Sequence, residues 1–287
     1  MLIVLFSLFL RPVAIDYRSK MESPAWRSFW DWSLFVSGIV PALIFGVTFG
    51  NLLQGVPFHF DDTMRSFYTG DLLSLLNPFA LLAGLVSVSM LIMQGAAFLT
   101  VKTDHSVYAR SYVVAKRSAL LTAVLFVLAG IWVAFGIEGF QLSSVLSHSG
   151  PSNPLLKDVS MQQGAWLNNF REMPALWIFP ALGVFGSLAV LLMQRDGSRF
   201  VASGIGVAGI IATAGVAMFP FVLPSSTHPS QSLTMWDATS SEQTLWLMFV
   251  AAVIFVPLIL AYTAWVFHVL RGRVTVKEIQ DNEHTAY

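Results

Sequence analysis

The sequence has 287 residues, of which 55% are apolar and only 11% are charged. A water-soluble domain of this size needs more polar surface, so the composition excludes a soluble protein and predicts an integral membrane protein. The formal net charge of zero excludes a nucleic-acid-binding protein, because counterion release requires a clustered excess of Lys and Arg. The absence of Cys excludes disulfides, thiolate metal sites and iron–sulfur ligation by this chain.

Long apolar runs predict an all-α membrane protein, a polytopic helix bundle with six full transmembrane helices and one truncated N-terminal helix. Each full run is long enough for the roughly 20 residues that a helix needs to cross a bilayer. We expect one integral membrane domain over residues 1–287. The predicted spans are a partial one over about 1–15 and full ones over 31–53, 79–100, 118–140, 175–193, 200–223 and 245–270.

The first apolar run, Met1 to Leu10, stops at Arg11-Pro12 and is too short to cross a bilayer. It also lacks the basic start and the small-residue cleavage site of a signal peptide. We therefore interpret it as the remaining part of a longer helix and expect a hydrophobic segment to be missing before Met1.

Basic residues predict the orientation of the spans, because Lys and Arg accumulate in cytoplasmic loops. A cytoplasmic C-terminus leaves thirteen of the sixteen basic residues on the inner side and three on the outer side. The inner set is Arg11, Arg18, Lys20, Arg27, Lys102, Arg110, Lys116, Arg117, Arg195, Arg199, Arg271, Arg273 and Lys277; the outer set is Arg65, Lys157 and Arg171.

Haem or copper inside the bilayer would need His or Met ligands on facing helices. The six histidines are His59, His105, His148, His228, His268 and His284, and only His268 falls in a predicted span, at its inner end. We predict no catalytic, cofactor-binding or metal-ligating residue in this chain. No ionisable residue lies in the middle of a full span, which argues against a proton relay built from this chain alone.

Two polar or small-residue features lie inside predicted spans. Gly204 to Gly209 matches the dinucleotide fingerprint GxGxxG but lacks the preceding strand and the following acid. Because small residues allow helices to approach closely, we interpret it, like Gly46 and Gly50, as a packing motif. Gln94 lies deep in its span, where an amide needs a partner, so we expect it to make an interhelical polar contact.

Five strings resemble subunit II of the cytochrome bd ubiquinol oxidases, and the resemblance runs from end to end of the chain. The strings are RPVAIDYRSK from Arg11, FGNLLQGVPF from Phe49, LNPFALLAG from Leu76, AMFPFVLPSS from Ala217 and LTMWDATSS from Leu233. Members of the family carry two further N-terminal helices and a His-Trp-Asp-Gly-Asn-Gln stretch that this sequence does not contain. The chain therefore resembles a subunit II that starts inside its third helix.

The resemblance implies a helical subunit that pairs with a subunit I and ligates no haem of its own. Subunit I of the family binds haem b and haem d and oxidises quinol, and the complex reduces dioxygen to water. Some members also hold a structural quinone in subunit II, and a small single-helix subunit is a further possible partner. The implied location is the bacterial inner (cytoplasmic) membrane, in contact with lipid.

By family likeness, Asp16 and Lys20 match positions near a proton-access route at the subunit boundary, and Arg11 lies close by. Other acids of that route would fall in the missing N-terminal part. The residues themselves leave a second interpretation open: a positive cytoplasmic loop with a local salt bridge. Nothing in the sequence requires the Asp and Lys pair to pass protons.

A membrane transporter or permease is the alternative function, because the chain has six full spans, four of them with a proline inside, and polar outer loops. In a transporter built from inverted repeats, we would expect interrupted helices at corresponding places in the two halves of the sequence. The sequence shows no such pairing.

Overall fold

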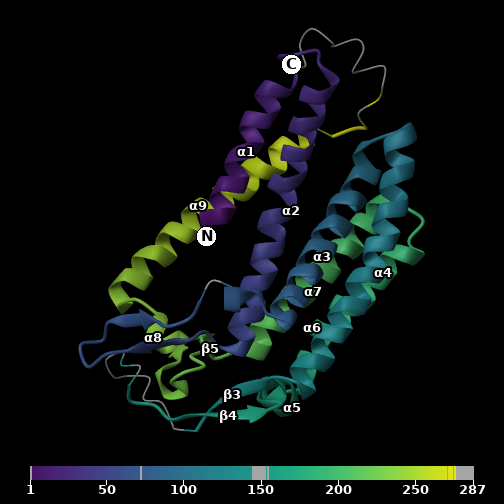
Figure 1. The fold of residues 1–287 in the computed structure, drawn as a ribbon. Coiled ribbons are helices and arrows are strands. Elements are labelled where there is room, and N and C mark those ends of the chain that lie inside the picture. The colour runs from purple at the N-terminus through teal and green to yellow at the C-terminus, as the bar shows by residue number, and fades with distance from the viewer. Residues whose placement is uncertain are drawn as a thin grey trace.

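The computed structural model describes residues 2–71, 73–143, 153, 155–269, 271–273 and 275. Within them the chain forms long helices joined at one end by three short β-hairpins, and Figure 1 shows this arrangement. The helices are α1 (Leu2–Arg18), α2 (Pro24–Gln54), α3 (Pro78–Lys102), α4 (His105–Phe135), α5 (Asn168–Glu172), α6 (Ile178–Leu192), α7 (Asp196–Met218), α8 (Met235–Ala238) and α9 (Glu242–Val269).

Six of these segments are long and apolar enough to cross a membrane, which confirms the predicted fold class. The residues at the starts of α2 and α3 are ones that favour the beginning of a helix. Pro24 and Pro78 occupy the first helical positions of α2 and α3, where the missing N–H is no loss. The Asn77 side chain also caps α3 by accepting a hydrogen bond from the Ala80 N–H.

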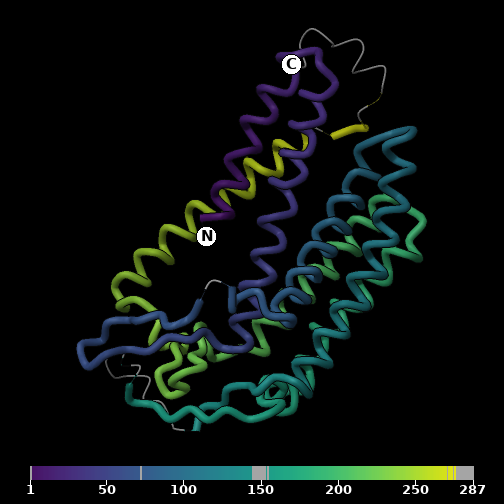
Figure 2. The backbone as a smooth tube through the Cα atoms, viewed as in Figure 1, coloured from purple at the N-terminus to yellow at the C-terminus, as the bar shows by residue number. Residues whose placement is uncertain are grey.

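The helices pack in a defined order. The helices α3, α4, α6 and α7 form a four-helix group in which α3 contacts α4 and α7, and α6 contacts the same two. α2 packs on α3, and α1 packs on α2. None of the residues of α9 is buried, and the helix runs apart from the four-helix group in Figures 1 and 2.

The three hairpins close one end of the bundle, which we call the hairpin end. They pair β1 (Phe58–Phe60) with β2 (Ser66–Tyr68), β3 (Glu138–Leu142) with β4 (Val159–Gln163), and β5 (Phe221–Leu223) with β6 (Leu233–Thr234), each antiparallel. A core of aromatic and aliphatic side chains lies under them, with Trp166 and Phe140 buried beside Phe221.

Two predicted spans end differently in the structure. Residues 136–140 and 219–223 were expected to be helical, but α4 ends at Phe135 and α7 ends at Met218. In both places the chain turns into a short strand, after Gly136 in the first case and through the Phe219–Pro220 peptide in the second. Hydropathy does not separate the two forms, because buried apolar side chains such as Phe140 and Phe221 continue the apolar run past the end of each helix.

Most helices also extend beyond their predicted spans. α2 starts at Pro24 rather than at residue 31, and α4 starts at His105 rather than at 118. The added turns carry polar and charged side chains, such as Arg27 and Arg110, which a hydropathy window leaves out. The first apolar run continues through Pro12 to Arg18 as α1.

Candidate functional site

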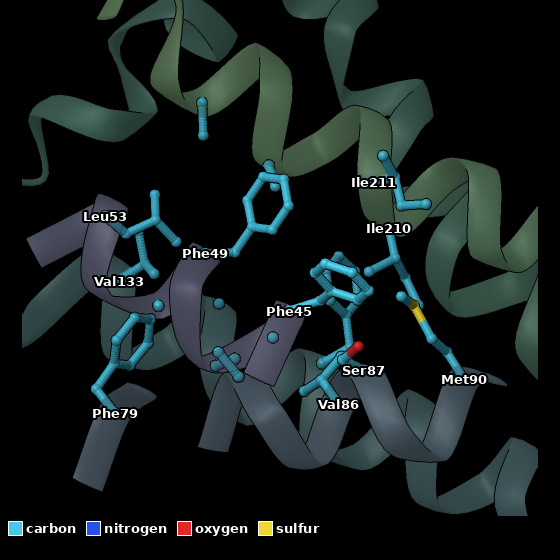
Figure 3. Close-up of a pocket in the computed structure, with 18 of the residues that line it drawn as sticks. Phe45, Phe49, Leu53, Phe79, Val86, Ser87, Met90, Val133, Ile210 and Ile211 are labelled. Atoms are coloured by element: carbon cyan, nitrogen blue, oxygen red, sulfur yellow. The ribbon is translucent and has the colours of Figure 1, made fainter. Parts of the chain in front are cut away.

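An apolar cavity of about 330 Å³ lies where α2, α3, α4 and α7 meet. Figure 3 shows side chains from these four helices around it, among them Phe45 and Phe49 of α2 and Ile210 of α7. The polar atoms along its walls are few, and Ser87 supplies a hydroxyl. The space is therefore suited to an apolar molecule or chain rather than to a charged solute.

Glycines bring α2 and α3 together at this cavity. A Cβ atom at Gly46 would lie 2.4 Å from the Ala83 carbonyl oxygen, and one at Gly50 would lie 2.6 Å from the Ala80 Cα. No larger residue fits at either position without moving the backbone of α3. The close approach confirms the interpretation of these glycines as a packing motif.

The residues around the cavity do not fit a haem. Haem iron is held in proteins by His, Cys, Met or Tyr side chains, and the only such side chain on the wall is Met90. Across the described residues, no three His, Asp or Glu side chains lie close enough together to hold a metal ion. We therefore assign no haem chemistry to the residues of this cavity.

The structure places Arg11, Asp16 and Lys20 on α1 and on the turn that follows it. The Arg11 guanidinium donates a 3.2 Å hydrogen bond to the Ser37 carbonyl of α2. Asp16 is exposed, and Lys20 Nζ lies 5.1 Å from the centre of the Tyr17 ring. Arg11 thus contacts the neighbouring helix, whereas Asp16 faces away from the core.

An ion pair at this turn joins Arg18 to Asp31, with 2.6 Å between Arg18 Nε and Asp31 Oδ1. Both side chains are about half exposed, so the pair adds little to stability. The local salt bridge expected here therefore connects α1 to α2 and uses two residues that the sequence analysis had not selected.

Gln94 lies on α3 and faces α7. Its Oε1 accepts a 2.6 Å hydrogen bond from the Ser203 hydroxyl, and Ser203 is fully buried. One turn further along α7, Gly206 and Gly209 lie against Gly186 and Gly183 of α6. A Cβ atom at Gly209 would lie 2.4 Å from the Gly183 nitrogen, which confirms helix packing as the role of the GxGxxG string.

A polar cluster that was not predicted from the sequence lies at the end opposite the hairpins. Arg199, which was counted among the basic residues of the inner side, lies in the first turn of α7 with 0% exposure of its side chain. Its Nη1 is 2.9 Å from Asp196 Oδ1, and its Nη2 donates to the Met193 carbonyl. The guanidinium carbon lies 4.4 Å from the centre of the Tyr112 ring of α4.

The same cluster ties the segment after α9 to the bundle. Arg273, which follows α9, lies 2.7 Å from Asp196 Oδ2, and Tyr108 of α4 donates a 3.1 Å hydrogen bond to Asp196 Oδ1. Asp196 thus joins α4, α7 and the segment after α9. The sequence holds one sign of this cluster, because Tyr108 and Tyr112 are four residues apart and therefore share a helix face. Nothing in the sequence pairs them with Arg199.

Comparison with known proteins identifies the chain over its whole length. The family model described as cytochrome bd terminal oxidase subunit II matches residues 1–270. A protein of Escherichia coli K12 named "Cytochrome bd-I ubiquinol oxidase subunit 2" is 51% identical over an alignment that covers 100% of this chain and 76% of that protein. A "Probable cytochrome oxidase subunit 2" of Haemophilus influenzae is 50% identical with the same coverage.

A solved structure shares the fold. The bd oxidase from Geobacillus thermodenitrificans contains a chain that matches with a TM-score of 0.61 at 16% identity, covering 93% of this chain and 71% of that one. At this identity the match supports the helical architecture alone. The family model and the two relatives show that the chain belongs to the cytochrome bd terminal oxidase subunit II family.

Proposed function

We propose that this protein works as subunit II of a cytochrome bd-type quinol oxidase, paired with a subunit I in the bacterial cytoplasmic membrane. The complex would oxidise quinol and reduce dioxygen to water. The observation that carries the proposal is the identity of about half of all residues across the entire chain with proteins named as this subunit. The same match favours this function over a transporter.

Haem b and haem d belong to subunit I in this proposal. The walls of the apolar cavity support that division, because they offer a thioether and a hydroxyl and no imidazole. His268, the histidine of the predicted spans, is exposed at the far end of α9 and away from the helix contacts of the bundle. The role of this chain is then to supply helices that hold the haem-bearing subunit in its active form.

The cavity is our candidate for the tail of a bound quinone. Its walls are almost entirely hydrocarbon, and Phe45, Phe49 and Phe79 give it flat aromatic surfaces (Figure 3). An isoprenoid tail has no polar atoms to satisfy, so burial in such a space is favourable. The polar headgroup would have to lie outside the apolar part of the cavity.

Arg11, Asp16 and Lys20 are our candidates for the water-accessible edge of the contact with subunit I. Asp16 and Lys20 are exposed at one end of α1, and Arg11 fixes α1 to α2. An exposed carboxylate beside an ammonium group can organise water at a membrane surface. We place this edge on the cytoplasmic side, with the C-terminus on the same side, because basic residues gather there.

Expression with and without subunit I tests the proposal. Purified together, the two chains should show the absorption bands of haem b and haem d and should consume dioxygen with a quinol as donor. Purified alone, this chain should carry no haem. Haem retained by the lone chain would contradict the division of labour, and uptake of a solute into vesicles that contain it alone would favour a transporter.

A further inference from the structure

Two histidines from distant parts of the chain meet at the hairpin end. His59 lies on β1, and His228 lies in the loop between β5 and β6. Their ring centres are 5.3 Å apart, and the ring planes are inclined by 41°. His59 is partly buried against Phe67, whereas His228 is exposed, so the pair is open to solvent on one side.

The backbone holds these two histidines in position. Val56 and Ser225 form a β-bridge next to them, and the Thr227 hydroxyl donates a 2.8 Å hydrogen bond to the Phe58 carbonyl. The His228 N–H donates to the Ser225 hydroxyl, which itself donates to the Phe58 carbonyl. The residues that flank both histidines are therefore bonded to one another, and the fold fixes the distance between the two backbone positions.

That separation suits two imidazoles on one metal ion. A zinc–nitrogen bond is about 2.0–2.1 Å and the ring centre lies about 1.1 Å beyond the nitrogen, so two ligands at the tetrahedral angle have ring centres about 5.2 Å apart. The observed 5.3 Å agrees with this value. A ring contact without any metal also falls in the range of 4.5–7 Å typical of such pairs, so the distance alone does not decide.

Charge at this end of the molecule favours a cation. The loops there carry eight carboxylates against three basic side chains. The acids are Asp61, Asp62, Asp71, Glu138, Asp158, Glu172, Asp237 and Glu242, and the bases are Arg65, Lys157 and Arg171. A surplus of negative charge raises the local concentration of divalent cations. Asp61, two residues from His59, adds to it, although its Oδ1 already accepts hydrogen bonds from Thr63 and Arg65.

We propose that His59 and His228 form a two-imidazole site for a divalent transition-metal ion, Zn²⁺ or Cu²⁺. Neutral imidazole is a preferred ligand of both ions. Among the described residues no third His, Asp or Glu completes a cluster, so water fills the remaining positions. The site is separate from the apolar cavity and does not depend on the proposed oxidase function.

Copper and zinc titrations of the full chain, purified with subunit I through a tag without histidine, test the site. Wild-type protein should bind one Cu²⁺ with an electron paramagnetic resonance spectrum of two-nitrogen ligation. His59→Ala and His228→Ala should each remove one nitrogen and weaken Zn²⁺ binding, measured by calorimetry, by more than about tenfold. His105→Ala, which removes an exposed histidine at the opposite end, should leave both unchanged.

A second measurement needs no variant. Zn²⁺ should protect His59 and His228, but not His105, from acylation by diethyl pyrocarbonate, as read by mass spectrometry. Equal acylation with and without Zn²⁺ would show that the rings only stack. Saturable one-site binding that persists unchanged in a folded His59→Ala/His228→Ala double variant would also overturn the proposal.

Discussion

Lys157 and Asp237 form an ion pair that is shielded from solvent at the hairpin end. Lys157 Nζ lies 2.6 Å from Asp237 Oδ2, and the two side chains are 0% and 7% exposed. The same carboxyl accepts hydrogen bonds from the Thr234 N–H and hydroxyl. The pair therefore connects the segment before β4 to the short helix that leads into α9.

Replacing Lys157 with Met should destabilise the protein by about 3–5 kcal/mol, because it leaves the Asp237 carboxylate buried without its partner. Thermal unfolding in detergent, followed by circular dichroism, measures the loss. Arg65→Met, which removes an exposed charge at the same end, is the control and should change little. A Lys157→Met/Asp237→Leu variant should recover part of the loss. If the double variant instead loses the sum of the two single losses, the explanation is contradicted.

The same pair should make stability depend on acid pH. Burial raises the pKa of the Asp237 carboxyl, but hydrogen bonds from Lys157 and Thr234 outweigh it and hold the pKa below its ordinary 3.8. A carboxyl whose pKa is lowered on folding stabilises the fold at pH values above its pKa in the unfolded state. That stabilisation is lost as the pH falls through the pKa of the folded state. The difference in melting temperature between wild type and Asp237→Asn should be large at pH 7 and shrink below about pH 4. A difference that is constant with pH would show that charge is not involved.

Gly209→Ala should disrupt the contact between α6 and α7. The added methyl would lie 2.4 Å from the Gly183 nitrogen and 2.8 Å from the Phe179 carbonyl oxygen, so the helices must move apart. We expect a clear fall in melting temperature and lower yield of folded protein. Gly215→Ala on the same helix meets no atom within 4 Å and should be neutral or slightly stabilising. Equal effects of the two substitutions would contradict a packing role.

The hydrogen bond between Gln94 and Ser203 should appear as coupling in a double-mutant cycle. Side-chain hydrogen bonds between membrane helices contribute about 0.6 kcal/mol on average, up to about 1.7. Gln94→Leu and Ser203→Ala should each destabilise the protein, and the double variant should lose less than the sum. Unfolding by denaturing detergent provides the free energies. Strict additivity would mean that Gln94 acts through packing alone.

The number and order of the membrane spans could be predicted from sequence because they depend on local composition. A run of about 20 apolar residues has few stable forms besides a helix in lipid. The glycine motifs were also interpretable, since small residues inside a span have mainly one use. The helix ends near Gly136 and Met218 could not be placed, because buried apolar side chains such as Phe140 and Phe221 follow them and continue the apolar run.

The burial of Arg199 could not be predicted for a different reason. Its environment is made by Asp196 on its own helix and by Tyr112 on α4, which is far away in sequence. Counting Lys and Arg on each side predicts the orientation of the spans but not the exposure of each cation, so burial of a cation against another helix goes unseen. The His59–His228 contact escaped notice for the same reason, because β1 and the loop after β5 meet only in the folded protein.

Replacing Arg199 with Ala should loosen the end of the bundle opposite the hairpins. Arg199 binds Asp196 and the Met193 carbonyl and covers the Tyr112 ring, so its removal leaves a cavity and takes a partner from Asp196. Removing one partner of a buried ion pair typically costs about 3–5 kcal/mol of stability. Arg195→Ala, on the exposed residue before α7, should have little effect on the melting temperature.

Arg199→Lys separates charge from shape at this position. A lysine keeps the positive charge but cannot bond Asp196 and the Met193 carbonyl with one planar group, nor stack on Tyr112 in the same way. We therefore expect it to recover less than half of the stability that Arg199→Ala loses. Because Arg199 holds the Asp196 carboxylate in the position where Arg273 also binds it, both Arg199 variants should misplace this carboxylate. Limited proteolysis should then cut the segment after α9 faster in them than in wild type. Full recovery of stability by lysine would show that charge alone matters here.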